Sequence, residues 1–361
     1  PGPASYRRGG PLAVTDANVM VGKVQPRFFP SVFGPDANQP LDAEVVRGHF
    51  AKLATQTWRA AEDVAHGFIQ IAVQQMANAI KKISVARGYD VTRYTLQCFG
   101  GAGGQHACLV ADALGMSQVM VHPLAGVLSA YGMGLADQNV MREESIERRL
   151  DAAAMPFMAE RLQALGETAR QALLVQMGQG SDAASAQRIE LRQRAHLRYE
   201  GTDSALVVPW GDQAQLVAGF EAAYRQRFAF LMQGKALVVE AVSVEAVLPG
   251  DAPEEAVLAV HPQRDVPRRD TVQVYAANAQ GVAQWQDAAL VVREDMRPGD
   301  VVDGPAIIAE KNATTVVEAG WQARLTALDH LLLVRVQARS VQHAAGTQAD
   351  PVLLEVFNNL F

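Results

Sequence analysis

The first part of the chain alternates between helical and extended patterns of hydrophobic residues. Apolar side chains recur at spacings of four, four, four and three at Phe68, Ala72, Met76, Ile80 and Ile83. This spacing predicts an amphipathic helix from about Ala60 to Arg87. Buried strands are predicted at 94–99 and 118–122, with a helix from Gln105 to Leu114 between them. A helix of small residues is predicted from about Ala125 to Ala136. Alternating helices and strands are typical of an α/β fold.

A second series of elements follows. Met141 to Leu150 is charged and is predicted to be extended, and residues 151–178 have the spacing of a long amphipathic helix. Two strands, a helix and a Val-rich strand are predicted next, at 187–199, 205–208, 215–228 and 236–248. From Thr271 to about Val336, short runs of Val, Ile and Leu alternate with turn residues, which predicts a small β-rich module.

These patterns divide the chain into four predicted regions. Residues 1–150 form an α/β domain, 151–250 an α+β continuation, and 251–340 the β-rich module. Residues 341–361 begin as a polar linker and end in an amphipathic stretch. We expect that stretch to be the start of a further domain.

Composition narrows the function classes. The formal charge of −6 over 361 residues provides no basic surface of the kind that binds nucleic acid. No apolar run reaches the roughly 18 residues that span a bilayer. The two cysteines, Cys98 and Cys108, lie in apolar contexts and form no metal-binding spacing. They are predicted to be buried free thiols, so we expect a cytoplasmic protein without nucleic-acid or membrane partners.

A glycine-rich turn between a predicted strand and a predicted helix is the main candidate site. Residues 99–107 read FGGAGGQHA. Glycine allows a ligand to approach the main chain closely, and the first N–H groups of a helix attract negative charge. The turn lacks the GxGxxG spacing and the lysine of known phosphate loops. It therefore suits the adenosine part of a nucleotide better than the terminal phosphates. A tight turn that only permits close packing is an open alternative.

Asp16 and Asn18 are the second candidate pair. One interpretation places them at a cavity, where a carboxylate and an amide could contact substrate or a magnesium-bound water. The other makes Asp16 a cap of a short helix. No catalytic triad can be assembled from spacing alone, and no metal ligand can be assigned.

Several motifs resemble the hydantoinase A/5-oxoprolinase family. The turn at 99–107 and the segment AGVLSAYGMGLAD at 125–137 are similar to family motifs, as are PGPASY at 1–6 and TDAN at 15–18. RYEGTD at 198–203 resembles ATP-dependent 5-oxoprolinases specifically. Residues 304–321 are similar to the C-terminal module of the A region, and DPVLLEVFNN at 350–359 resembles the start of hydantoinase B.

The resemblance implies the second lobe of an actin-like ATPase fold, of the sugar kinase, chaperone and actin superfamily, followed by the small β-rich module. It implies ATP and Mg²⁺ as cofactors, a hydantoinase B-like domain in the same chain and a homo-oligomer. The nucleotide would contact the residues of the glycine-rich turn: Gly100, Gly101, Ala102, Gly103, Gly104 and Gln105. Asp16 and His106 would be catalytic, and Asn18 would bind substrate.

The implied reaction opens a cyclic amide, 5-oxoproline, at the expense of ATP. Phosphorylation of the ring carbonyl would create a group that water can attack, with magnesium and a positioned base assisting. Ser5 departs from the family pattern, which has Cys at this position. The phosphate-binding loops of the actin-like fold belong to a region that does not match any part of this sequence, so we expect the chain alone not to hydrolyse ATP. An ATP-dependent hydantoinase or N-methylhydantoinase, and a non-catalytic nucleotide-binding fragment, are the alternatives.

Overall fold

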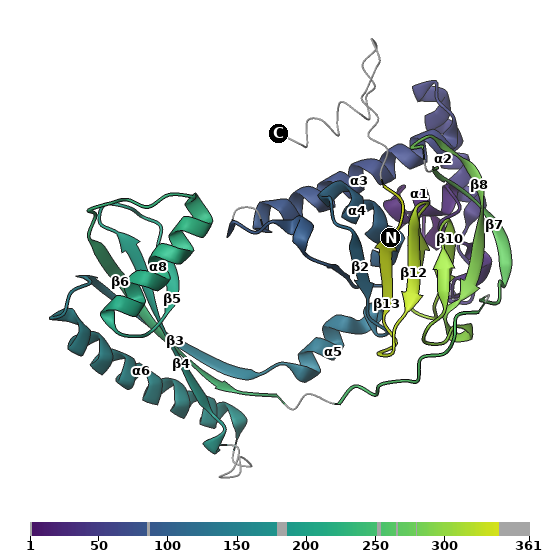
Figure 1. Ribbon diagram of the computed structural model, residues 1–361. Coiled ribbons are helices and arrows are strands. Elements are labelled where there is room, and N and C mark those ends of the chain that lie inside the picture. Colours follow the sequence, from purple (N-terminus) through teal and green to yellow (C-terminus); the bar gives the residue numbers. More distant parts are fainter. Residues whose placement is uncertain are drawn as a thin grey trace. The chain divides into compact units, whose positions relative to one another are not determined.

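The computed structural model describes residues 2–84, 87–178, 186–250, 254–264, 266–278 and 280–338. The chain divides into two units. Unit 1 combines Pro1–Val85, Tyr89–Ser129 and Glu255–Phe361, and unit 2 consists mainly of Ala130–Glu254. Both units mix helices with β-sheets, so the predicted α/β class is confirmed at this level (Figure 1).

Unit 1 begins with helices. They are α1 (Val14–Met20), α2 (Ala43–Thr57) and α3 (Ala61–Ser84). Asp42 caps α2 by accepting a hydrogen bond from the backbone N–H of Val45 at 3.1 Å. Next come β1 (Leu96–Cys98), α4 (Ala107–Leu114) and β2 (Gln118–Val121). Gly115, at φ 72°, ends α4 in the left-handed conformation that glycine adopts without strain.

The remaining strands of unit 1 come from the C-terminal part of the chain. They are β7 (Asp270–Ala277), β8 (Ala283–Val292), β9 (Val301–Asp303), β10 (Ala306–Ala309), β11 (Thr314–Val317), β12 (Trp321–Leu325) and β13 (Leu331–Arg335). One sheet has the order β1-β2-β13-β12-β9, and the other has the order β11-β10-β8-β7. β13 runs antiparallel to β2 and places Leu333 opposite Val119.

The division into units differs from the predicted boundaries. The predicted β-rich module at 251–340 is not separate, because β9, β12 and β13 complete the sheet that β1 and β2 begin. Every residue of β11 is buried, whereas β7, β8, β9 and β12 also carry exposed positions. The boundary predicted near residue 150 is also displaced, because the change from unit 1 to unit 2 falls within α5 (Leu128–Leu135).

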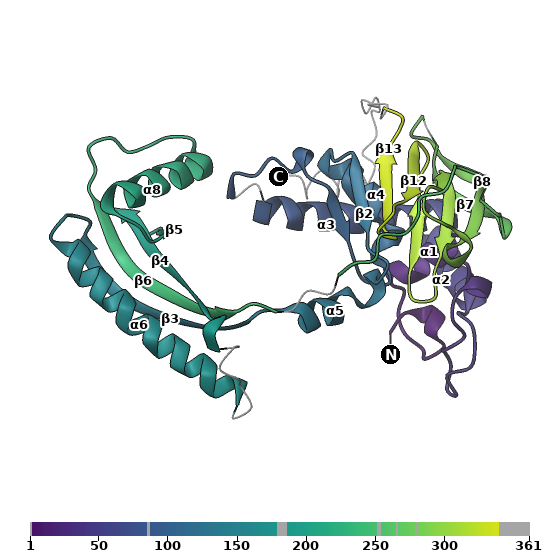
Figure 2. The same ribbon diagram turned by 60° about the horizontal axis from the view of Figure 1, so that its bottom comes forward.

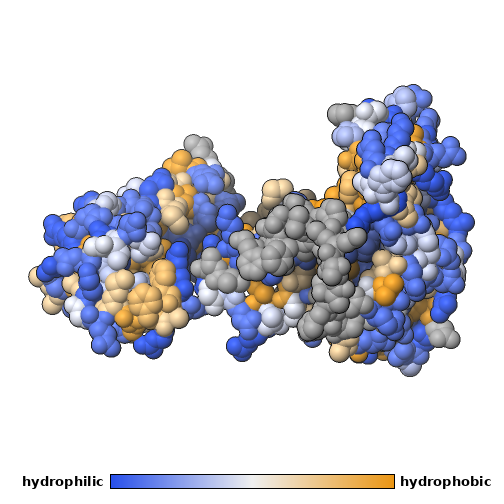
Figure 3. All heavy atoms as spheres, turned by 90° about the horizontal axis from the view of Figure 1, so that it is seen from above, coloured by the Kyte–Doolittle hydropathy of each residue, from blue (hydrophilic) through white to orange (hydrophobic). Residues whose placement is uncertain are grey.

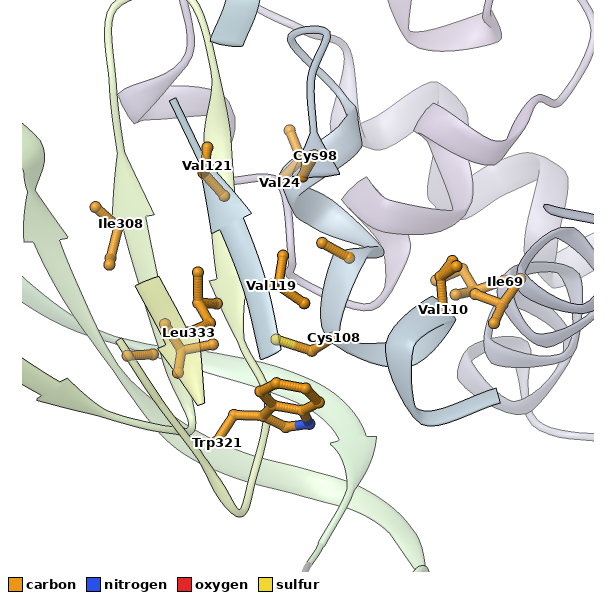
Figure 4. Packing of buried hydrophobic residues seen from close by; sticks show 14 of the residues in the cluster. Val24, Ile69, Cys98, Cys108, Val110, Val119, Val121, Ile308, Trp321 and Leu333 are labelled. Carbon is orange, nitrogen blue, oxygen red and sulfur yellow. The ribbon is translucent and has the colours of Figure 1, made fainter. Parts of the chain in front are cut away.

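The core of unit 1 joins all three of its chain segments. Ile69 of α3, Val119 of β2 and Trp321 of β12 are each fully buried in one hydrophobic cluster. Figure 4 shows Cys108 of α4 in the same cluster, between Val119 and Trp321. Burial of this many apolar side chains is the main stabilising term of such a unit. Unit 1 therefore requires the C-terminal strands for its core.

Apart from Ala86–Gly88, unit 2 is continuous in sequence. Its strands are β3 (Gln138–Arg149), β4 (Glu190–Tyr199), β5 (Leu206–Pro209) and β6 (Leu237–Leu248), and its helices are α6 (Ala154–Met177) and α8 (Gln213–Phe228). The antiparallel sheet has the order β3-β6-β4-β5 and curves strongly (Figure 2). Met158 of α6 and Phe220 of α8 are fully buried against it. The predicted elements from 141 to 248 are therefore present, with ends shifted by a few residues.

Candidate functional site

The glycine-rich turn links β1 to α4 and has two different sides. On one side it is packed against the chain: a Cβ added to Gly101 would lie 2.8 Å from the carbonyl oxygen of Asn312, and one added to Gly104 would lie 2.7 Å from that of Thr314. Real Cβ atoms do not approach this closely, so these two positions require glycine. Gly100 has φ 87° and donates its N–H to the carbonyl of Ala125 at 2.7 Å.

The other side of the turn faces a cavity of about 780 Å³. Ala102, Gly103, Gln105 and His106 line it from the turn, together with Asn18 from α1. Its remaining walls are mainly apolar and come from α3, β1 and α4. The cavity is large enough for a drug-sized or nucleoside-sized ligand. One side of the turn therefore fits the close-packing interpretation, and the other side faces a cavity that could admit a ligand.

Three predicted site residues meet at the polar end of this cavity. The side-chain amide nitrogen of Asn18 donates to Oε1 of Gln105 at 2.8 Å and lies 3.1 Å from Nε2 of His106. All three side chains are buried. The contact brings together residues separated by 87 and 88 positions in sequence. They form a rigid polar corner in an otherwise apolar cavity.

His106 is held in its neutral form. Burial lowers the pKa of His106 to about 4, and the nearby positive charge of Lys23 acts in the same direction. Since the Asn18 amide occupies Nε2, the ring proton belongs on Nδ1, which has no partner among the described residues. In this geometry neither ring nitrogen is free to take a proton from a ligand. The arrangement favours a positioning role for His106 over the predicted role as a base.

Asp16 lies away from the cavity. It is fully buried, and its two carboxylate oxygens accept hydrogen bonds from the backbone N–H groups of Ala4, Ser5 and Ala13 at 2.8–3.0 Å. Side chains at positions i and i+2 of a helix point in nearly opposite directions. Asp16 and Asn18 on α1 therefore cannot face the same cavity. The structure thus favours the capping interpretation of Asp16.

A buried ion pair near the site was not predicted. Lys23 is fully buried and pairs with Glu318, which is 295 residues away in the sequence. Both charges act on His66: burial lowers the pKa of His66, Lys23 lowers it further, and Glu318 opposes this. Of the two charges, only Lys23 acts on the pKa of His106, which it lowers. The only local signal was a lysine between Val21 and Val24, which is insufficient to predict a distant partner.

The cysteines match the prediction. Cys98 and Cys108 are both buried and free. Burial raises the pKa of the Cys98 thiol to about 11 and raises that of Cys108 as well. Neither thiol is activated as a nucleophile in this environment.

A second cavity of about 450 Å³ lies beside the loop that contains Asn312. Its lining is more polar and includes Arg293, Lys311 and Asp329. Arg293 donates to Oδ1 and to the backbone carbonyl of Asp329 at 3.0 and 2.6 Å, so these two charges are already paired.

One group of side chains has the composition of a metal site. Candidate ligand atoms of His122, Glu255 and His330 lie within 4.8 Å of one another. However, Nδ1 of His122 accepts the N–H of Leu124 at 3.0 Å. A neutral ring then carries its proton on Nε2, the nitrogen that faces Glu255 at 3.8 Å. That proton occupies the position a metal would need, so the geometry does not favour a metal here.

Comparison with known proteins decides the family. The hydantoinase/oxoprolinase family model matches residues 1–142, and the model of the hydantoinase/oxoprolinase C-terminal domain matches residues 181–337. The two matches follow each other in one chain. The chain belongs to the hydantoinase/oxoprolinase family. The family predicted from the motifs is therefore confirmed.

Two relatives of the chain carry the name 5-oxoprolinase. 5-Oxoprolinase 1 of Arabidopsis thaliana is 34% identical over the whole chain, and the 5-oxoprolinase of Dictyostelium discoideum is 31% identical. The chain spans only 28–29% of the length of these relatives.

Two solved structures share the fold. The ATP-dependent caprolactamase from Pseudomonas jessenii superposes with a TM-score of 0.77 at 23% identity, covering 93% of this chain and 49% of that one. Acetone carboxylase in its nucleotide-free form gives a TM-score of 0.67 at 21% identity, over 92% and 48% of the two chains. At 21–23% identity, the two comparisons show a shared fold.

The family motif at 1–6 can now be placed. Ser5, the departure from the family's Cys, is fully buried and does not line the cavity. Its hydroxyl has no hydrogen-bond partner among the described residues. The difference between Ser and Cys at this position therefore does not alter the residues that line the cavity. Among the helices that the structure describes, none has the length and apolar character needed to cross a bilayer.

Proposed function

We propose that the chain is part of an ATP-dependent cyclic amide hydrolase, with 5-oxoproline as substrate and glutamate, ADP and phosphate as products. The observation that carries this proposal is the identity of 31–34% to curated 5-oxoprolinases along the entire chain. The name of the caprolactamase, another ATP-dependent enzyme acting on a lactam, supports the same reaction class. The RYEGTD motif at 198–203 favours 5-oxoproline over hydantoins.

The cavity beside the glycine-rich turn fits the adenosine part of ATP. Its volume of about 780 Å³ and its apolar walls suit a purine and a ribose. Gly101 and Ala102 have no acceptor for their N–H groups among the described residues, so these groups can donate to a ligand. We propose that unit 1 is the second lobe of an actin-like ATPase and that Gly100 to Gln105 hold the nucleoside.

The same cavity does not fit the charged part of the nucleotide. Neither lysine, arginine, aspartate nor glutamate occurs among its described lining residues. Phosphates are commonly bound by cationic side chains in addition to backbone N–H groups, and Mg²⁺ needs oxygen ligands, commonly carboxylates. We propose that Mg²⁺ and the phosphates are bound by residues outside this cavity, and we assign no metal ligand in this chain.

The predicted site residues then have distinct proposed roles. Asn18, Gln105 and His106 form the fixed polar end of the cavity, where Asn18 contacts the ligand directly. His106 orients the Asn18 amide as a neutral acceptor. Asp16 contributes by fixing the residues of the PGPASY motif to α1. A hydantoinase B-like domain, a homo-oligomeric assembly and a cytoplasmic location complete the proposal.

The proposed function can be tested by measuring phosphate release by the protein that the complete reading frame encodes. With ATP present, we expect 5-oxoproline to stimulate phosphate release and glutamate to accumulate, whereas hydantoin gives much less. Stimulation by hydantoin alone would identify a hydantoinase instead. Absence of stimulation by either ring would favour a non-catalytic nucleotide-binding protein. A malachite-green assay of the 361-residue chain alone should detect no turnover.

A further inference from the structure

Phe99 is an exposed aromatic residue at the wall of the cavity beside the glycine-rich turn. It follows β1 directly, lines the cavity, and has 58% of its surface exposed. No ring–ring contact involves Phe99 in the part of the chain that the structure describes. The surface in the view of Figure 3 is mainly hydrophilic, with hydrophobic residues in small groups. An exposed phenyl ring beside an apolar cavity provides a stacking face for a flat ligand.

Besides Asn18 and Gln105, two exposed carboxamides line the same cavity. Gln75 belongs to α3 and Gln97 to β1, and both side chains are exposed. Among the described residues, the Gln75 side chain makes no hydrogen bond, and that of Gln97 makes only a long contact, 3.5 Å from its amide nitrogen to the carbonyl of Cys98. Each carboxamide offers one donor group and one acceptor on the same plane. Both are therefore available to a ligand in the cavity.

These groups match one purine better than the other. Adenine presents an amino donor at N6 beside an acceptor at N7, and a glutamine pairs with both atoms at once. Guanine presents two acceptors, O6 and N7, which an arginine or lysine reads best. The described lining contains neither of these basic residues.

We propose that Phe99, Gln75 and Gln97 form an adenine-selective base site, with Phe99 stacking on the purine and the carboxamides reading its edge. The proposal rests on the proposed function, since it assigns the base of the same nucleotide. It adds side chains that read the edge of the base, whereas the glycine-rich turn supplies only backbone groups.

Saturation-transfer NMR with adenosine and guanosine on the 361-residue chain tests the base site directly. Adenosine should bind at least tenfold more tightly than guanosine. Phe99→Ala should weaken adenosine binding about 5- to 100-fold, in keeping with the value of base–aromatic stacking, and Phe99→Tyr should restore it. Gln75→Ala and Gln97→Ala should each bring the two affinities closer together.

Matched controls separate recognition from folding. Gln74→Ala changes the neighbouring residue of α3, which does not line the cavity, and Tyr94→Ala removes an aromatic ring that is 54% exposed and outside it. Both should leave the adenosine affinity unchanged, and all variants should keep the thermal midpoint of the parent chain. Equal binding of the two nucleosides, binding of neither, or wild-type affinity of Phe99→Ala would each overturn the base site.

A second measurement distinguishes this inference from the proposed function. In the complete protein, 5-oxoproline-stimulated phosphate release should have a lower KM for ATP than for GTP, and Phe99→Ala should raise the KM for ATP more than it lowers kcat. An enzyme that uses ATP and GTP equally, with Phe99→Ala unchanged, would refute the base site and leave the cyclic amide hydrolase intact. Absence of any phosphate release would instead refute the function.

Discussion

Unit 1 and unit 2 have comparable mixtures of helix and strand but are built in different ways. Unit 2 is essentially one continuous stretch whose strands pair mainly within about 100 residues of sequence. Unit 1 interleaves three stretches, and the pair β2–β13 joins residues about 210 positions apart. Its ion pair between Lys23 and Glu318 spans 295 positions. The candidate site lies entirely in unit 1, the unit that depends on distant parts of the chain.

This difference indicates which parts of the chain can fold alone. A unit with sequence-local pairing needs only its own segment. A unit completed by distant strands keeps an unpaired edge and an open core until those strands arrive. The following predictions test the contrast, in decreasing order of expected effect.

We expect the two units to differ most in whether their isolated segments can fold. Residues 130–254 should fold alone and unfold cooperatively, because they contain all strands of their sheet. Residues 1–129 should not fold alone, because β2 lacks β13 and the glycine-rich turn lacks the backbone at 312–314. Thermal melts followed by circular dichroism would measure this. A cooperative melt of residues 1–129 would refute the dependence on the C-terminal strands.

Breaking the buried ion pair should damage unit 1 selectively. Lys23→Met leaves Glu318 buried without its partner, which typically destabilises by about 3–5 kcal/mol. Hydrogen exchange should increase throughout unit 1 and stay unchanged at 130–250. The double variant Lys23→Met/Glu318→Leu should regain part of the loss, since it removes both charges. Equal loss of protection in both units would contradict the separation.

Acid should weaken unit 1 through His106. The pKa of His106 is about 4 in the folded chain, below its ordinary 6.5, so the unfolded chain binds the proton first as pH falls. The contribution of this group to stability should therefore decrease from about pH 6.5 to pH 4, by up to about 3 kcal/mol. Below pH 4 this contribution should not change further. His66, whose pKa is also lowered, acts in the same direction.

Urea unfolding at several pH values measures the effect of His106. His106→Gln keeps an acceptor for the Asn18 amide and removes the titrating ring. Its stability should depend less on pH than that of the parent chain. An identical pH profile for both proteins would exclude His106 as the source.

We expect the smallest change in stability when one buried serine is replaced in each unit. Among the described residues, the hydroxyl of Ser5 in unit 1 has no partner, whereas the hydroxyl of Ser243 in unit 2 lies 3.0 Å from Nε2 of His196. Removing an unsatisfied buried hydroxyl is stabilising, and removing a hydrogen-bonded one is destabilising. We expect Ser5→Ala to raise stability by about 1 kcal/mol and Ser243→Ala to lower it by a similar amount, both measured by urea midpoints. The same sign for both would contradict this assignment.

Most elements of unit 2 could be predicted from the sequence, because their signals are local. The helix predicted at 151–178 is α6 (Ala154–Met177), and the strand predicted at 236–248 is β6 (Leu237–Leu248). In unit 1, β1 and β2 were also predicted, and β7 to β13 lie within the region predicted to be β-rich. What the sequence could not indicate was the pairing of β13 with β2, because runs of Val and Leu are compatible with many partners.

The site shows the same limit. The glycine-rich turn could be located from its composition, and resemblance drew attention to Asn18, Gln105 and His106, which the structure brings together. The placement of Asp16 away from the cavity follows from helix geometry that the motif alone does not specify. The pair Lys23–Glu318 was missed because nothing near either residue indicates its partner. The aromatic Phe99 has a role only once the cavity beside it is known.

The pairing of β13 with β2 also affects synthesis of the chain. About 210 residues must be made after Val121 before Leu331 appears, which takes about 10–40 s at typical ribosomal rates of roughly 5–20 residues per second. During that interval unit 2 can finish folding while the edge of β2 and the apolar walls of the cavity remain open. Nascent chains of this protein should therefore be most vulnerable to aggregation, and most dependent on chaperones, before their last strands are made.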